Sequence, residues 1–232
     1  MNSAVIEKPA GTNIDKLRIN GERLWASLME LAKIGATPKG GVCRLTLTDL
    51  DKQGRDLVLS WAKEAGMTVV IDKIGNGFMR RAGRDNGLPP IVTGSHIDTQ
   101  PTGGKFDGNY GVLAGIEVVR TLNDHGIETE APIEVAFWTN EEGSRFVPVM
   151  MGSGVFAKAF TLEHAYVRKT WKANRSKTSC NASATWGHKS QATTRLARIS
   201  RPTSSKARCW KTTTSRLVWC KACWASAGLT AQ

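Results

Sequence analysis

The acidic residues of this chain are confined to its first 167 residues, and this distribution limits which part of the chain can form a globular domain. All 20 Asp and Glu side chains lie in residues 1–167, together with 18 Lys and Arg. Residues 168–232 hold the other 14 Lys and Arg, no acid, five of the eight Trp and four of the five Cys. Globular domains carry charges of both signs. We therefore expect one domain in residues 1–167 and no native domain in residues 168–232.

Residues 18–140 alternate between helical and extended patterns. Leucines at helical spacing predict a helix within residues 18–35, and a second follows between an N-cap at Thr48 and a glycine stop at Gly66. Short apolar runs bounded by Gly, Pro or polar residues predict strands, with a helix over 112–126 between the last two. The strand segments are 67–73, 78–83, 89–99, which ends in polar residues, and 131–140. This alternation predicts an α/β fold, in which sites gather at the carboxyl ends of strands.

A histidine and an aspartate end the third of these strands. In "GSHIDT", His96 and Asp98 stand two residues apart, so that both face the same way on an extended segment. The Asp98 carboxylate can then accept a hydrogen bond from the imidazole and leave the other ring nitrogen for a metal. For this short pattern alone, a satisfied histidine at a strand end is the favoured alternative.

Three further carboxylates follow in polar loops. Asp107 lies in the glycine-rich "GGKFDGNYG", where it either approaches a metal or caps the next helix. Glu141 and Glu142 follow a buried strand, where unpaired charge is costly and a divalent cation would remove the cost. Two such carboxylates can divide the roles of ligand and proton carrier, and Asp107 could bridge two metals. A solvated acidic loop is the alternative for the pair.

The three motifs together resemble one enzyme group. "GSHIDTQPTGGKFDGNYGVLAGIEVVRTLND" followed by "WTNEEGSRF" is similar to the N-carbamoyl-L-amino-acid hydrolases, β-ureidopropionases and allantoate amidohydrolases of the dinuclear-metal aminoacylase and peptidase superfamily. The likeness covers about residues 14–166. It implies part of a catalytic domain, with a mixed sheet flanked by helices and two divalent ions. Zinc is the first expectation, with manganese, cobalt or nickel as substitutes.

The resemblance also implies residue roles. His96 would bind one metal, Glu142 the second, and Asp107 both. Glu141 would be the general base that takes a proton from the attacking water and passes it to the leaving nitrogen. Asp98 would orient His96.

The resemblance further implies a small-molecule substrate with a carbamoyl, ureido or amidine C–N bond, and a homodimeric, cytoplasmic enzyme. One cysteine in residues 1–167, Cys43, agrees with a reducing compartment. No secretory leader and no apolar run of membrane length is visible, so we expect no membrane partner. A peptide or N-acyl-amino-acid hydrolase of the same superfamily is the alternative.

The tail is predicted to be a normal coding sequence translated in the wrong phase. One permitted set of codons for "TSSKARCWK" (203–211), regrouped by one base, gives His-Ile-Glu-Gln-Gly-Pro-Val-Leu-Glu, a ligand motif of the resembled group. One phase works over about 60 residues, which places the shift between Tyr166 and Lys169. As written, the chain would then lack this ligand, a later histidine ligand and the dimerisation domain. We therefore expect it to be inactive.

Nucleic acid binding and zinc binding are the two alternative functions of the tail. Its basic and Trp-rich composition could bind nucleic acid by charge and stacking, although without sequence specificity. Its cysteines match no paired zinc module. They are Cys180, Cys209, Cys220 and Cys223. We expect neither a specific nucleic acid partner nor a zinc site in the tail.

Overall fold

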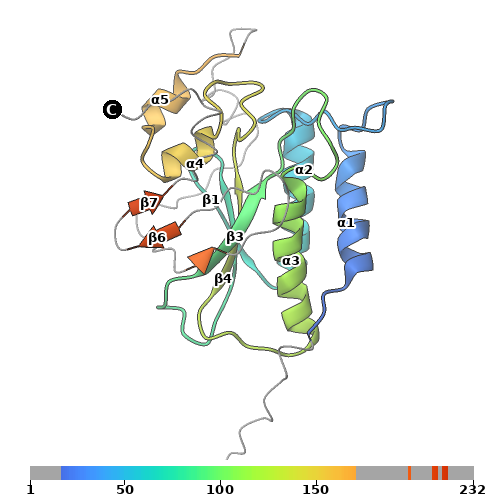
Figure 1. The fold of residues 1–232 in the computed structure, drawn as a ribbon, viewed down its shortest axis with the longest axis vertical. Helices are drawn as coiled ribbons and strands as arrows, with labels where there is room; N and C mark the ends of the chain where they lie inside the picture. Colours follow the sequence, from blue (N-terminus) through green and yellow to red (C-terminus); the bar gives the residue numbers. More distant parts are fainter. Residues whose placement is uncertain (1–16, 171–197, 200–210, 214–215, 219–232) are drawn as a thin grey trace, which may run out of the picture.

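A computed structural model describes residues 17–170, 198–199, 211–213 and 216–218 of the chain (Figure 1). The helices are α1 (Gly21–Lys33), α2 (Asp49–Glu64), α3 (Asn109–Asp124), α4 (Met151–Phe156) and α5 (Leu162–Tyr166). The strands are β1 (Thr68–Ile71), β2 (Gly77–Arg81), β3 (Ile91–His96), β4 (Ile133–Trp138), β5 (Arg198–Ile199), β6 (Lys211–Thr213) and β7 (Arg216–Val218). Within these residues, no helix has both the length and the apolar character that a membrane crossing requires.

Five strands form a mixed sheet in the order β1-β2-β4-β3-β5. Strand β4 pairs antiparallel with β2 and parallel with β3, and it is buried along almost its whole length. In the β3–β4 ladder, His96 stands opposite Trp138, the last residue of β4. The carboxyl ends of β3 and β4 therefore meet at one edge of the sheet, and the loops that follow them are brought together there.

Helices cover the sheet on both faces. Figure 1 shows α1, α2 and α3 together on one side of the strands, with α4 and α5 on the other. Alternate residues of β4 point to opposite faces. Val135 and Phe137 join the larger apolar cluster with the first three helices, whereas Ala136 faces Phe78 and packs near Phe156 of α4. The predicted α/β fold with a mixed sheet and flanking helices is confirmed.

The predicted helix ends are confirmed where a side-chain signal marked them. The Thr48 hydroxyl accepts a hydrogen bond from the Asp51 amide (3.3 Å) at the start of α2. Gly66 has a φ of 76° just after that helix, a conformation that glycine adopts without steric cost. Helices α4 and α5 were not predicted, because six and five residues are too few to show a helical period.

In the tail, the structure describes residues 168–170 and three short strands. Strands β6 and β7 pair antiparallel with each other, and β5 pairs parallel with the start of β3. The predictions about the tail cysteines and about nucleic acid binding fall outside the described residues. The boundary at residues 167 and 168 and the out-of-phase origin of the tail remain predictions.

Candidate metal centre

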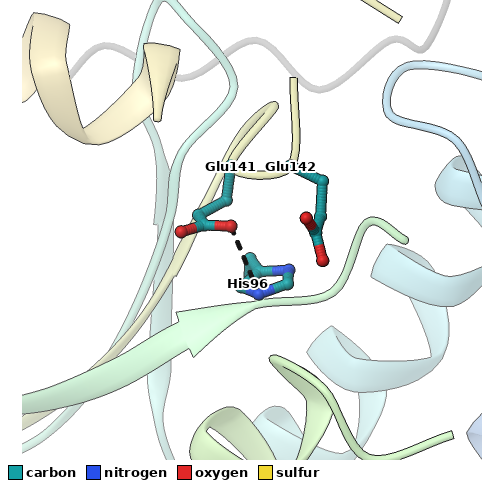
Figure 2. A group of neighbouring side chains, drawn as sticks. All are labelled: His96, Glu141 and Glu142. Carbon is teal, nitrogen blue, oxygen red and sulfur yellow. Dashed lines mark ion pairs between the residues drawn. The ribbon is translucent and has the colours of Figure 1, made fainter. Parts of the chain in front are cut away.

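Three of the predicted site residues converge at the carboxyl edge of the sheet. His96 ends β3, and Glu141 and Glu142 stand in the loop after β4 (Figure 2). One ligand atom from each of the three lies within 4.8 Å of the others. The Glu141 Oε2 atom is 3.5 Å from Nε2 of His96. The parallel pairing of β3 and β4 produces this convergence, although 45 residues separate His96 from Glu141 in the sequence.

Asp107 joins the group from the loop before α3. Its Oδ1 atom lies 4.0 Å from Nε2 of His96, the same ring nitrogen that faces Glu141. The alternative role of Asp107 as a helix cap is wrong, because Gly108 holds the N-cap position of α3 and no side chain caps this helix. The structure therefore places Asp107 beside His96, and its role as a metal ligand stays a prediction.

The hydrogen bonding of His96 fixes which ring nitrogen faces the carboxylates. Nδ1 lies 2.8 Å from the backbone oxygen of Asp98. A carbonyl oxygen only accepts, so Nδ1 carries the hydrogen and, in the neutral ring, Nε2 presents a lone pair. That lone pair faces the carboxylates of Glu141 and Asp107. Electron pairs facing each other in a buried site repel, and a proton or a metal cation between them removes the repulsion. These donors fit a divalent cation.

The carboxylate of Asp98 does not act on His96 in the predicted way. Its Oδ1 atom is 3.8 Å from Nδ1, beyond hydrogen-bond distance, because the backbone oxygen takes that bond instead. The two carboxylate oxygens accept hydrogen bonds from the amides of Glu141 and Glu142 (3.3 Å each). Asp98 thus connects the end of β3 to the acidic loop after β4.

Negative charge and burial shift two pKa values at the site. Burial raises the pKa of the Asp98 carboxyl to about 7, against the attraction of His96, and the negative charge of Asp51 adds to the rise. Burial lowers the pKa of the His96 imidazole, but the charges of Glu141 and Asp98 outweigh this and leave that pKa above its ordinary value. The rise at His96 shows that the surrounding carboxylates favour an added positive charge, whereas the rise at Asp98 is mainly an effect of burial.

Two positioning contacts at this edge were missed by the sequence analysis. The Gln100 amide donates to Oε2 of Glu142 (2.9 Å) and so fixes the direction of that carboxylate. Asn140, directly before the acidic pair, is fully buried with a φ of 54°, and its side chain donates to the carbonyls of Phe146 and Pro148. The sequence offered one signal for this contact, the asparagine itself, because asparagine tolerates the left-handed backbone conformation better than most residues do.

Substitutions of Asn140 should separate its backbone role from its side-chain role. Asn140→Gly keeps the left-handed backbone and loses two hydrogen bonds, at about 1 kcal/mol each. Asn140→Ala loses the same bonds and adds about 1–2 kcal/mol of backbone strain. Urea unfolding of both variants measures the difference. Equal stability of the two variants would contradict a strained backbone at this position.

Other polar residues near the motifs have structural roles. Arg145 donates to the carbonyls of Thr46 and Leu47, and its guanidinium lies over the ring of Phe146. His125 is the C-cap of α3. The described part of the chain therefore brings together His96, Asp98, Asp107, Glu141 and Glu142 and no other predicted site residue.

Comparison with known families agrees with this geometry. Residues 92–195 match Peptidase family M20/M25/M40. The chain contains part of a domain of this family. The matched range includes the strand, loop and acidic pair of the candidate metal centre. It also runs past residue 167 into the tail.

Named relatives lie in the group that the three motifs resemble. The N-carbamoyl-L-amino-acid amidohydrolase of Rhizobium meliloti is 59% identical over 152 residues, which are 66% of this chain and 36% of the relative. The corresponding enzyme of Geobacillus stearothermophilus is 48% identical over 139 residues, which are 60% of this chain and 34% of that enzyme. The chain thus spans about a third of the length of these relatives. The predicted resemblance is confirmed.

A solved structure shows the same likeness in three dimensions. The crystal structure of an amidase of the hydantoinase/carbamoylase family from Burkholderia multivorans superposes with a TM-score of 0.77 at 60% identity. The match covers 79% of this chain and 44% of the amidase. The fold of the matched part of this chain is therefore similar to that of part of such an amidase.

Proposed function

We propose that residues 17–170 form the first part of a metal-dependent amidohydrolase that cleaves the linear C–N bond of N-carbamoyl amino acids or related ureido compounds. The observation that carries this proposal is the buried Nε2 of His96, which faces the carboxylates of Glu141 and Asp107. The relatives named above supply the reaction class. A carbamoyl substrate is their property, and we extend it to this chain as a proposal.

In this mechanism, two divalent ions would be held by His96, Asp107 and Glu142. Zinc is the metal that we expect first. When bound, such ions polarise the carbonyl of the substrate and acidify water. Glu141 accepts the proton of the attacking water and delivers it to the leaving nitrogen. Asp98 fixes the backbone from which Glu141 projects, through the amide hydrogen bond described above. Gln100 orients Glu142.

A fusion enzyme tests the reaction class. Residues 1–166 would be joined to the remaining C-terminal portion of the Rhizobium meliloti relative, which supplies the rest of the domain. We expect the fusion to release ammonia from N-carbamoyl-L-amino acids with a kcat/KM within about tenfold of the relative, or about 1.4 kcal/mol.

The substrate panel decides between the two hydrolase classes. Preference for N-acetyl amino acids or dipeptides over N-carbamoyl amino acids would support the peptide or N-acyl alternative, which the peptidase name of the family keeps open. A folded, metal-loaded fusion with no activity on any of the three substrates would refute the proposal.

We further propose a cytoplasmic location, a homodimeric full-length enzyme and a tail that is read in a shifted phase. A cytoplasmic location accords with the single free cysteine of the described residues, Cys43. Homodimer formation is carried over from the resembled group alone. Sequencing the gene across the codons for residues 160–175 tests whether the tail is read in a shifted phase.

A further inference from the structure

One buried arginine connects three segments of the chain behind the candidate metal centre. The Arg44 side chain is completely inaccessible to solvent. Its Nη1 donates to the carbonyls of Leu31 (3.0 Å) and Ile34 (2.8 Å), at the end of α1. Its Nε donates to the carbonyl of Ile97 (3.0 Å), and its Nη2 to Oδ1 of Asn109 (2.9 Å). The guanidinium therefore binds three separate parts of the fold at once.

Two of these parts carry predicted metal ligands. Ile97 is the residue after His96, so its carbonyl belongs to the backbone that aims the imidazole. Asn109 stands two residues after Asp107, and its Nδ2 donates to the Lys105 carbonyl (3.1 Å), which closes the loop around Asp107. Arg44 thus holds the end of β3 against the loop 105–109.

The fold makes room for Arg44 at a cost. A Cβ atom on Gly54, inside α2, would lie 2.8 Å from Cδ of Arg44, so this helix position requires glycine although glycine weakens helices. The direct hydrogen-bond partners of the guanidinium are carbonyl and amide oxygens. The negative charges of Asp51 and Asp98 attract it from farther away, but burial is the larger effect and lowers the pKa of Arg44, so holding the charge there is expensive. The negative end of the α1 dipole offsets part of this cost. An apolar side chain would fill the volume without this cost, so the charge indicates a role beyond packing.

We propose that Arg44 is a positioning residue that sets the distance between His96 and Asp107. The loop passes so close to His96 that a Cβ atom on Gly108 would lie 2.4 Å from Cε1 of the imidazole. The loop therefore cannot come nearer, and Arg44 prevents it from moving away. A lysine cannot replace it, because one ammonium cannot reach acceptors that lie in three directions, as the planar guanidinium does. The consequence for metal binding rests on the proposed function, but the positioning itself is a property of the metal-free chain.

Hydrogen exchange of the metal-free 232-residue chain tests the positioning. In Arg44→Lys, peptides covering residues 105–111 should exchange about tenfold faster than in the unsubstituted chain, because the loop opens locally. Val58→Ala is the control, since Val58 is a fully buried residue of α2 outside the site. Its destabilisation should not single out this loop. Equal exchange of the loop in the two variants would overturn the proposal.

A double-mutant cycle identifies the contact responsible. Asn109→Ala removes the acceptor of Nη2 and the closure of the loop, so adding Arg44→Lys to it should change loop exchange much less than Arg44→Lys alone does. Fully additive effects would show that Arg44 acts elsewhere and would also overturn the proposal.

Cobalt(II) titration, followed by visible absorption, links the positioning to metal binding. Arg44→Lys should weaken cobalt binding by about 10–100-fold, as is usual when the support of metal ligands is removed. Val58→Ala should leave the affinity unchanged. Unchanged affinity in Arg44→Lys would contradict the proposal. If the unsubstituted chain binds no cobalt, the ligands that it is expected to lack are required for binding, and the exchange experiment alone decides the role of Arg44.

Discussion

Glutamine in place of Glu141 is expected to lower the turnover number of the fusion enzyme by about 10²–10⁴-fold while its cobalt affinity stays nearly constant. The amide of glutamine cannot act as a general base, because it lacks the carboxylate that accepts the proton. It keeps the size of the side chain and an oxygen that accepts hydrogen bonds. The structure gives Glu141 access to the site edge, with its Oε2 atom 3.5 Å from His96. The measurements are steady-state kinetics with an N-carbamoyl amino acid and cobalt titration of the same preparation.

Glu142→Gln is the matched control for this experiment. The two glutamates are adjacent and have the same side chain. The amide of Gln100 donates a hydrogen bond to Oε2 of Glu142 (2.9 Å) and orients that carboxylate. We expect Glu142→Gln to weaken cobalt binding by more than about tenfold. If Glu141→Gln loses the metal and Glu142→Gln keeps it, the two assigned roles are reversed.

Alanine in place of Gly108 is expected to destabilise the chain by about 2–5 kcal/mol and to weaken cobalt binding by at least about tenfold. Gly108 has a φ of 72°, and a Cβ atom there would lie 2.4 Å from Cε1 and 2.5 Å from Nδ1 of His96. The methyl group must therefore push the imidazole away from Asp107 or break the start of α3. Urea unfolding gives the stability, and cobalt titration gives the effect on the site.

Gly126→Ala separates the contact from the backbone strain. Gly126 has a similar φ of 61°, and nothing lies within 4 Å of the position that its Cβ would take. This variant should lose only the strain of about 1–2 kcal/mol and keep its cobalt affinity. Equal losses of stability in the two variants would show that the Gly108 backbone, rather than its contact with His96, sets the cost.

The sequence predicted the convergence at the metal centre because that convergence follows from the α/β pattern. His96 and Glu141 each follow an apolar run, and the carboxyl ends of parallel strands meet at one edge. For Asp107, the glycine-rich loop left a metal ligand and a helix cap as alternatives, and only the resemblance implied the ligand. The orientation of the side chains within the site could be predicted less well from the sequence. The sequence assigned the hydrogen bond of His96 to the carboxylate of Asp98, whereas the backbone carbonyl of the same residue accepts it.

The supporting contacts could not be predicted, because they depend on tertiary structure. Arg44 looks like any charged residue between two helices, and its burial follows only from the packing of α1, α2 and β3 around it. Gln100 donates a hydrogen bond to a residue 42 positions away, and Asn140 donates to residues six and eight positions away. No periodic pattern in the sequence marks such bonds. Sequence periodicity reports which face of an element is apolar, but it does not report which polar atoms meet across elements.

The central place of β4 determines when this molecule can assemble during synthesis. The chain makes the β1–β2 hairpin and β3 first, but these neighbours in sequence do not pair with each other in the sheet, since β4 lies between them. A nascent chain that ends before residue 133 therefore holds the sheet in two parts that share no strand pairing, with the imidazole on one of them and no acidic pair yet made. Addition of β4 joins the two parts and brings both glutamates to the histidine in the same event, so that the candidate metal centre forms as the sheet is joined.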